Sequence, residues 1–257
     1  MTGSVKYETS GPIARITFDR AGARNAMTWA MYDQLAECLT RLESDPTVRV
    51  LELRGSGGHF VAGTDIMQFE SFSSGDDGVA YERRLEVIVR QLENVRVPTV
   101  AVVQGNAAGA GLLFAAACDI RVCTPDAVFS APIARTVGNT LSLTSVGRLV
   151  VHLGVSRTKA LLMTAGTIEA AEARAAGFVS AVIEPQRLEL KVSDLVSKLA
   201  ELAPLTLRAT KQLVGRVANA MGAEEAEDIV REVYGSRDFR EGVTAFREKR
   251  SPSWEGR

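Results

Sequence analysis

The sequence predicts an α/β fold that continues into a helical C-terminal region, and three observations support this prediction. Strand-like and helix-like segments recur in the order strand, strand and helix. Glycine-rich turns follow the buried strands, notably at 55–63 and 105–111. The strand pattern disappears from about Gln186, where helical segments replace it. We therefore expect a core at 1–185, in which successive units bury one another, and a helical region at 186–257.

The individual elements follow from hydrophobic periodicity and from the residues that punctuate it. Strands are predicted at Val5–Glu8, Ile13–Phe18, Val48–Arg54, Pro98–Gln104 and Ile120–Cys123. Helices are predicted at Trp29–Ser44 with Thr28 as N-cap, and at Tyr81–Leu92, Ala110–Ala117, Leu188–Leu202, Thr206–Val217, Ala223–Tyr234 and Arg240–Lys249. A short helix is expected to begin near Thr64, and the polar, glycine-containing segment Ser71–Gly78 predicts a mobile surface segment.

Composition excludes several classes of function. The 257 residues fit one large domain or a domain with an appendage, and 46% apolar residues are enough for a core. The 30 basic and 31 acidic residues give a net charge of −1, so neither nucleic acid nor a membrane surface is an expected partner. Three cysteines without a CxxC pair and two histidines without a clustered motif predict reduced thiols and no metal site. With no signal peptide indicated, we expect a cytoplasmic protein.

Two loops carry the features that predict chemistry. In 57–66 and in 104–112, a strand runs into glycines and a helix then begins. The first N–H groups of a helix lack intrahelical partners and carry partial positive charge, and small residues let a ligand approach the main chain. Two such N–H groups aimed at one oxygen form an oxyanion hole, in which each donor contributes roughly 2.7–4 kcal/mol. Neither loop has the glycine order of a dinucleotide site or the ending of a nucleoside-triphosphate loop.

Taken together, these loops and four other segments resemble the crotonase superfamily, the enoyl-CoA hydratase/isomerase family. The resemblance runs nearly from end to end. It is carried by Arg24–Met27, Ala62–Ile66, Pro98–Gly111, Cys118–Arg121, Glu172–Val179 and Phe246–Pro252.

The resemblance implies a spiral of β-β-α units, followed by helices that mediate trimers or dimers of trimers. It implies an acyl-CoA substrate, with coenzyme A as part of the substrate and no separate cofactor. The oxyanion donors would be the N–H groups of Thr64 and Ala110. The remaining substrate-binding positions would be Ala62, Asp65 and Ile66 near the adenine and pantetheine, Arg24 and Lys249 near the phosphates, and Gly109, Leu113 and Ile133 near the acyl group.

The sequence departs from the family pattern at two positions. Hydratases of this family use two glutamates to deliver water across the double bond, and the matching positions here are Leu113 and Ile133. General acid–base help contributes about 10²–10⁴-fold to a rate, and neither side chain supplies it. The oxyanion hole consists of main chain and is unaffected. We therefore expect the chain to polarise a thioester but not to hydrate it in the ordinary way.

Several residues are candidates to replace the glutamates. Arg135 would bind a substrate carboxylate and Asn139 would orient a water molecule, although Asn139 and Thr140 also fit the cap of the next helix. His59 lies close to the first loop in the sequence, and its position also fits an ordinary loop residue. Glu82 and Glu86 lie on a helix that would border the acyl pocket, and their pattern is also that of a solvated face.

Three readings of the function remain open at this point. The first is an acyl-CoA enzyme of the enoyl-CoA hydratase/isomerase group with an atypical site. The second is decarboxylation of a malonyl-type CoA, which needs enolate stabilisation and an apolar site more than a strong base. The third is a protein that binds acyl-CoA or assembles with partners without catalysis.

Overall fold

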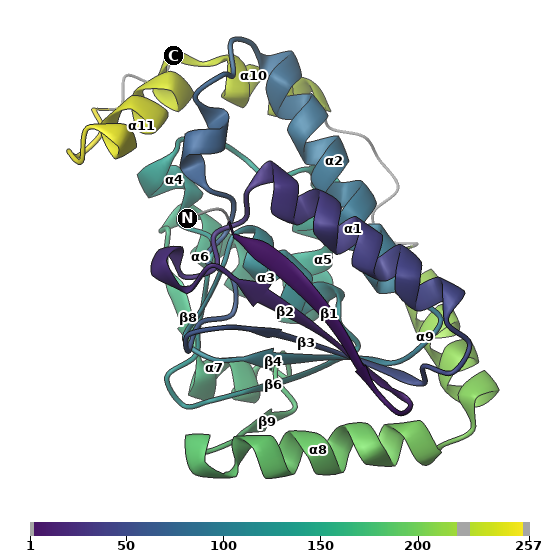
Figure 1. Ribbon diagram of the computed structural model, residues 1–257. Coiled ribbons are helices and arrows are strands. Elements are labelled where there is room, and N and C mark those ends of the chain that lie inside the picture. Colours follow the sequence, from purple (N-terminus) through teal and green to yellow (C-terminus); the bar gives the residue numbers. More distant parts are fainter. Residues whose placement is uncertain (1–2, 220–226, 254–257) are drawn as a thin grey trace.

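The computed structural model describes residues 3–219 and 227–253 and confirms the α/β fold with C-terminal helices (Figure 1). A mixed sheet of six strands lies at its centre, in the order β1-β2-β3-β4-β6-β9. The β1–β2 pair is antiparallel and the other pairs are parallel. The strands are β1 (Ser4–Ser10), β2 (Ile13–Asp19), β3 (Val50–Gly55), β4 (Thr99–Val103), β6 (Ile120–Cys123) and β9 (Ala181–Val182).

A second, smaller layer of strands accompanies the main sheet. It contains β5 (Asn106–Ala108), β7 (Val128–Ser130) and β8 (Thr167–Glu169). Isolated bridges from Met27 to Thr64 and from Val61 to Ala107 extend the same layer. From β3 to β7, each strand of the main sheet is followed by a strand or bridge of this layer. The spiral of β-β-α units is therefore confirmed.

The helices of the core are α1 (Trp29–Ser44), α2 (Gly75–Asn94), α3 (Ala110–Ala117), α4 (Ile133–Thr136), α5 (Leu143–Leu153), α6 (Val155–Met163) and α7 (Ala170–Ala175), with short 3-10 turns η1 (Ala21–Ala23) and η2 (Ile66–Phe69). Among these helices, α1 packs on β1, α3 packs on β5, and α2 and α5 pack on α3. Helix α1 begins and ends at the predicted residues, and the Thr28 hydroxyl accepts from the Met31 N–H at 3.3 Å. This cap satisfies one of the unpaired donors of the first turn.

Helix α8 (Pro185–Glu201) covers the face of the main sheet opposite to α1 (Figure 1). Its apolar residues recur at a spacing of four, which is the spacing of one helical face. Leu188, Val192 and Val196 pack against Val50, Val100, Val102 and Val122 of the sheet. Burying each of these side chains contributes about 1.5–3 kcal/mol, so α8 completes the core although it belongs to the helical region.

Helices α9 (Pro204–Asn219), α10 (Glu227–Gly235) and α11 (Arg237–Arg247) end the described chain. Helix α10 packs against α2 so closely that a Cβ on Gly75 would lie 1.8 Å from the Arg231 carbonyl oxygen. The sequence left open whether these helices pack on their own core or on another subunit. Helices α10 and α11 pack on α2, η2 and α4 of the same chain. Residues 223–226 of the predicted helix lie outside the described residues.

The prediction of a mobile segment at Ser71–Gly78 was wrong for its second half. Helix α2 begins at Gly75, and the Ser74 and Asp77 side chains form a capping box at its first turn. Gly75 and Gly78 are buried because α10 packs on them, so their missing side chains serve a close helix contact.

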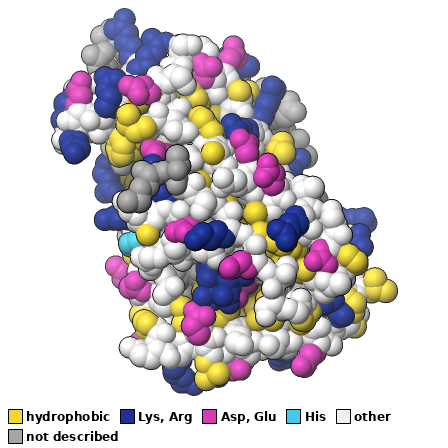
Figure 2. All heavy atoms as spheres, in the orientation of Figure 1, with side chains coloured by type: hydrophobic (Ala, Val, Ile, Leu, Met, Phe, Trp, Pro, Cys, Tyr) yellow, Lys and Arg dark blue, Asp and Glu magenta, His cyan; other side chains and the backbone are white. Residues whose placement is uncertain are grey.

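The surface and the thiols agree with the composition. Acidic and basic side chains are interspersed on the face shown in Figure 2. Cys38, Cys118 and Cys123 are buried and unpaired. Within residues 3–219 and 227–253, no helix has the length and apolar character needed to cross a membrane.

Candidate active site

The first glycine-rich loop is held by the segment that precedes α1. The Gly63 carbonyl accepts from the Met27 N–H at 2.8 Å, and the Asp65 N–H donates to the Met27 carbonyl at 2.9 Å. A trans peptide points its N–H opposite its C=O, so the Thr64 N–H points away from Met27. Among the described residues, this N–H has no hydrogen-bond acceptor.

The second loop is fixed in a similar way at the start of α3. The Gly109 N–H donates to the Ser130 carbonyl at 2.9 Å, and the Gly109 carbonyl accepts from the Leu113 N–H at 3.1 Å. The latter bond turns the Ala110 N–H outward from the start of the helix, where it meets no acceptor in the described chain. Gly109 has φ +50° and ψ −115°, a conformation that disfavours any side chain.

The two loops meet at their glycines. The Val61 N–H donates to the Asn106 carbonyl at 3.1 Å, and the Ala108 N–H donates to the Val61 carbonyl at 2.9 Å. A Cβ on Gly109 would lie only 3.7 Å from the Gly63 Cα. The free N–H groups therefore follow two glycines that lie close together, although 45 residues of chain separate those glycines.

Asp65 is engaged with its own loop. Its carboxylate accepts from the Met67 N–H at 3.1 Å, which caps η2, and it forms an ion pair with Arg20 at 2.8 Å. The neighbouring Ile66 is half-buried and packs on the core. Both residues thus hold the shape of the loop that presents the Thr64 N–H.

Arg24 and Lys249 are exposed cations near the first loop. The Arg24 carbonyl accepts from the Ala62 N–H at 3.0 Å, so Arg24 lies beside the first loop. Lys249 follows α11, which packs on η2. Neither side chain forms an ion pair within the described part of the chain. Both cations are therefore available to an anionic ligand.

Leu113 and Ile133 lie in apolar surroundings in the structure. Leu113 lies on α3 and is fully buried, and Ile133 is a half-buried residue at the start of α4. Arg135 is exposed on α4 and makes no ion pair with any described residue. Its position is open to a ligand but is not fixed by protein contacts.

Asn139 belongs to a buried hydrogen-bond network rather than to a helix cap, which corrects one alternative from the sequence. Its amide Nδ2 donates to the Tyr234 hydroxyl at 2.8 Å, and that hydroxyl donates to Glu82 at 2.9 Å. The cap of α5 is Ser142, whose N–H donates to the other oxygen of Glu82 at 2.8 Å. The Asn139 Oδ1 atom is buried without a partner among the described residues.

Glu82 does not lie on a solvated face, so that expectation was wrong. Its side chain is 3% exposed. Glu52 is the other buried carboxyl in the described chain. Glu52 pairs with Arg15 and Arg54, whereas Glu82 accepts hydrogen bonds from two neutral donors, the Ser142 N–H and the Tyr234 hydroxyl. Burial without a cation raises the pKa of Glu82 to about 7.

The two histidines lie in different surroundings. The His59 ring covers Gly105, where a Cβ would meet its Nδ1 at 2.4 Å, and the ring lies 3.4 Å from the Asn106 amide nitrogens. His152 is near the end of α5 against Phe178, and burial lowers its pKa to about 4. Protonation of His152 near neutral pH is therefore disfavoured.

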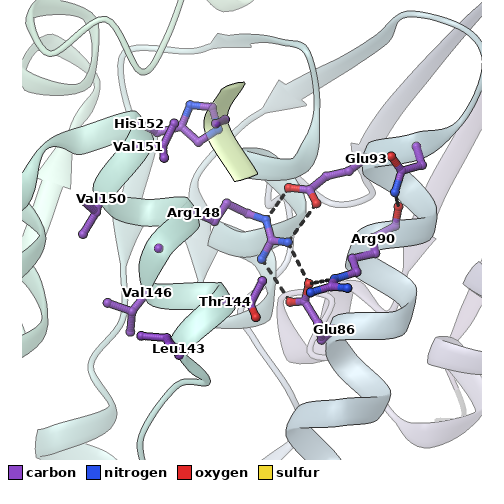
Figure 3. A pocket seen from close by; sticks show the side chains of 13 residues that line it. Glu86, Arg90, Glu93, Leu143, Thr144, Val146, Arg148, Val150, Val151 and His152 are labelled. Atoms are coloured by element: carbon purple, nitrogen blue, oxygen red, sulfur yellow. Dashed lines mark hydrogen bonds and ion pairs between the residues drawn. The ribbon is translucent and has the colours of Figure 1, made fainter. Parts of the chain in front are cut away.

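A cavity of about 510 Å³ lies between α2, α5 and α9, away from the two loops (Figure 3). On its wall, the Arg148 guanidinium forms ion pairs with Glu86 and Glu93. Valine side chains of α5 and Ala218 of α9 line other parts. None of its lining residues belongs to either glycine-rich loop, so it is separate from the two free N–H groups.

Two tyrosines beside the first loop were missed at the sequence level. Tyr32 and Tyr81 hydrogen-bond to the Thr64 hydroxyl. Each lies on the apolar face of its helix, one turn before a buried leucine, which is Leu35 on α1 and Leu85 on α2. That spacing indicates burial, but it does not show that the two hydroxyls share one target.

No group of histidine, cysteine and acidic residues suited to hold a metal is found among the described residues. Comparisons with known proteins show the family of this chain. The enoyl-CoA hydratase/isomerase family matches residues 8–257.

Two relatives and one solved structure illustrate the similarity. "Enoyl-CoA hydratase domain-containing protein 2, mitochondrial" of Bos taurus is 34% identical over 95% of this chain and 84% of its own. The "Short-chain-enoyl-CoA hydratase" of Clostridium acetobutylicum is 30% identical over 96% of this chain and 95% of its own. The structure of a methylmalonyl-CoA decarboxylase in complex with 2-nitronate-propionyl-CoA has a TM-score of 0.89 and 28% identity, covering 98% of both chains. The chain therefore belongs to the enoyl-CoA hydratase/isomerase family, within the crotonase superfamily.

Proposed function

We propose that this chain binds an acyl-CoA thioester and stabilises its enolate with the N–H groups of Thr64 and Ala110. The observation that carries the proposal is the close approach of Gly63 and Gly109, each of which precedes an N–H group that has no acceptor in the described chain. An oxyanion would accept both hydrogen bonds in a site that main chain alone defines. Each donor would lower the barrier by roughly 2.7–4 kcal/mol.

The remaining substrate contacts follow from the positions around the loops. Arg24 and Lys249, both exposed and without ion pairs in the described chain, would bind the CoA phosphates. Ala62 and Ile66 would contact the adenine and pantetheine. Asp65 would act through the loop conformation, because its carboxylate already pairs with Arg20.

The acyl side of the site would be apolar. Gly109 and Ile133 would line it, and Leu113, which is fully buried, would lie beneath its surface. Leu113 and Ile133 occupy the positions of the family glutamates. Without these carboxylates, water has no base to activate it, and the rate of hydration would fall by about 10²–10⁴-fold for each lost group. We therefore propose an atypical member of the hydratase/isomerase group that polarises a thioester.

Decarboxylation of a malonyl-type CoA is the second candidate, and the similarity to a methylmalonyl-CoA decarboxylase favours it. In this reaction the bond between the α-carbon and the carboxylate breaks, and its electron pair moves into the thioester enolate. Carbon dioxide leaves, and a proton from water ends on the α-carbon. Arg135 would bind the substrate carboxylate, and Asn139 would orient the water.

A panel assay tests both candidates. It compares crotonyl-CoA hydration, 3-enoyl-CoA isomerisation and methylmalonyl-CoA decarboxylation with the affinity for each thioester. Hydration at the rate of a family hydratase would refute the role given to Leu113 and Ile133. Decarboxylation alone would select the second candidate. Tight binding without turnover would identify a non-catalytic acyl-CoA-binding or assembly protein, and no thioester binding would refute the acyl-CoA proposal.

Variants with glutamate restored test the same point from the protein side. Leu113→Glu and Ile133→Glu, alone and together, return a carboxylate to each position that differs from the family. We expect hydration to rise most in the double variant, because the acid and the base act on the same water. Equal and unchanged hydration in all three variants would mean that these positions do not face the substrate.

We also propose that the chain self-associates as a trimer or a dimer of trimers in the cytoplasm. The surface of α9 supports association, because Leu205, Leu213, Val214 and Val217 are largely exposed. Unpaired buried thiols support a reducing compartment, and the balanced charge supports neither nucleic acid nor a membrane as partner. Light scattering tests the assembly, and a monomer at micromolar concentration would contradict it.

A further inference from the structure

Three hydroxyl groups meet in the interior directly beside the first loop. The Thr64 Oγ1 atom lies 2.6 Å from the Tyr32 hydroxyl and 2.7 Å from the Tyr81 hydroxyl. Tyr32 comes from α1 and Tyr81 from α2, two helices that run side by side (Figure 1). The tyrosines are 1% and 8% exposed, so water does not compete for these hydrogen bonds.

The Thr64 hydroxyl is engaged by this cluster. A hydroxyl group donates one hydrogen bond and accepts others, and here it has a tyrosine hydroxyl on either side. Burial raises the pKa of both Tyr32 and Tyr81, so both phenols stay neutral. The Thr64 side chain is therefore an anchor in the interior, while its backbone N–H is the group without an acceptor in the described chain.

Thr64 is restrained in two ways, by the backbone bonds of its neighbours and by the bonds of its own side chain. The bonds of Gly63 and Asp65 to Met27 fix the direction of the peptide that carries the Thr64 N–H. They belong to an isolated bridge rather than to a strand ladder, and the nearest other backbone bonds that precede Thr64 in this loop are made by Val61 and Ala62, three and two residues before it. The bonds of the Thr64 hydroxyl to α1 and α2 add a restraint on Thr64 itself, because they tie this residue to two helices.

We propose that Tyr81 and Tyr32 are positioning residues that set the place of the Thr64 N–H in the oxyanion hole, an inference that rests on the proposed function. Tyr81 also links that donor to the C-terminal helices, because α2 carries α10 on Gly75 and Gly78. A donor that is displaced from the oxyanion stabilises the transition state less than one at its proper distance. Loss of a tyrosine hydroxyl therefore lowers kcat by about 10-fold, a part of the 10²–10³-fold that a whole donor contributes.

A purely structural role would also explain the cluster, because three buried hydroxyls satisfy one another. The test therefore needs a readout other than stability. A cinnamoyl-CoA thioester is a suitable probe, since its ultraviolet absorption moves to longer wavelength when its carbonyl is polarised by hydrogen-bond donors. The measurement is the red shift of the bound probe, together with its dissociation constant.

The variants separate the anchor from general effects of truncation. Tyr81→Phe, Tyr32→Phe and Thr64→Val each remove one hydroxyl, whereas Thr64→Ser keeps the hydroxyl and tests for recovery. Tyr7→Phe is the matched control, because the Tyr7 hydroxyl is buried on β1 and has no partner within the described residues.

We expect the full-length protein to bind the probe with a red shift. Tyr81→Phe and Thr64→Val should lose at least half of this shift while the dissociation constant changes by less than about threefold, because the CoA contacts remain. Thr64→Ser should recover most of the shift, and Tyr7→Phe should match the parent protein. Where Tyr81→Phe does not fold, Tyr32→Phe and Thr64→Val carry the same comparison.

Two outcomes would overturn the inference, and they differ from each other. A red shift that is equal in the parent protein, Tyr81→Phe, Tyr32→Phe and Thr64→Val would show that the oxyanion hole exists but that the hydroxyl cluster does not position it. A probe that binds the parent protein without a red shift, or does not bind, would refute the proposed oxyanion function itself.

Discussion

Replacing Glu82 by glutamine should reveal a pH dependence of stability that the parent protein conceals. Burial raises the pKa of Glu82 from 4.5 to about 7, so the folded protein holds a proton that the unfolded chain releases. The stability that this proton supports is complete below pH 4.5 and is lost as the pH rises through 7. A shift of this size corresponds to roughly 3 kcal/mol at 1.36 kcal/mol for each pKa unit.

His152 acts in the opposite direction over an overlapping range. Burial lowers its pKa from 6.5 to about 4, so the unfolded chain binds the proton more readily than the folded protein. The stability from neutral His152 is complete above pH 6.5 and is lost as the pH falls through 4, which again amounts to roughly 3 kcal/mol. Between pH 4.5 and 6.5 the two slopes oppose each other, and the parent protein should show a shallow profile.

Glutamine at position 82 reproduces the protonated form of the network. Its amide would donate to the Tyr234 hydroxyl, and that hydroxyl would donate to Asn139 after rotation of the Asn139 amide. The rotation would give the buried Asn139 Oδ1 atom the partner that it lacks among the described residues. Glu82→Gln should therefore be more stable than the parent protein at pH 8.5, by about 1–3 kcal/mol.

The assay is urea unfolding followed by circular dichroism at pH values from 4 to 9. In Glu82→Gln the free energy of unfolding should rise from pH 4 to 6.5, because only the His152 slope remains. In His152→Gln it should fall from pH 4.5 to 7. Glu169→Gln, at an exposed carboxyl, is the matched control. The reasoning would be refuted by a Glu82→Gln profile with the same slope as the parent protein.

Three further predictions concern the loops and the ion pairs. Gly109→Ala puts a side chain at φ +50° and should cost about 1–3 kcal/mol while lowering kcat, as urea unfolding and turnover would show; unchanged turnover would argue against the second loop. Arg148→Met leaves Glu86 and Glu93 without their guanidinium and should reduce the free energy of unfolding by about 3–5 kcal/mol, and an unchanged urea midpoint would contradict this. Arg24→Ala should weaken acyl-CoA binding by about 10-fold but leave acyl-pantetheine binding unchanged in calorimetry; equal losses for both ligands would exclude a phosphate contact.

Much of the fold was accessible from the sequence because local patterns and burial coincide. The apolar spacing of α1 and its Thr28 cap define that helix completely. The all-apolar run of α3 and the glycines before it likewise marked a buried helix after a turn. The segment at Gly75 was misread because glycines signal exposure and mobility locally, whereas here they permit the contact with α10.

The candidate site was predictable in its main chain and less so in its side chains. Glycines before Thr64 and Ala110 indicated free N–H groups without any knowledge of the tertiary structure. The hydroxyl partners of Thr64 come from residues 32 and 81, and the partners of Glu82 come from residues 142 and 234. Such long-range hydrogen bonds leave no periodic trace in the sequence, so helical spacing indicated only that these side chains are buried.

The most direct test of the account is a crystal structure with a CoA thioester that carries a stable enolate analogue. We predict that the thioester oxygen lies about 2.7–3.1 Å from both the Thr64 nitrogen and the Ala110 nitrogen, as in a functional oxyanion hole. A thioester oxygen that hydrogen-bonds to neither N–H, or an acyl group in the cavity beside Arg148, would contradict the central claim.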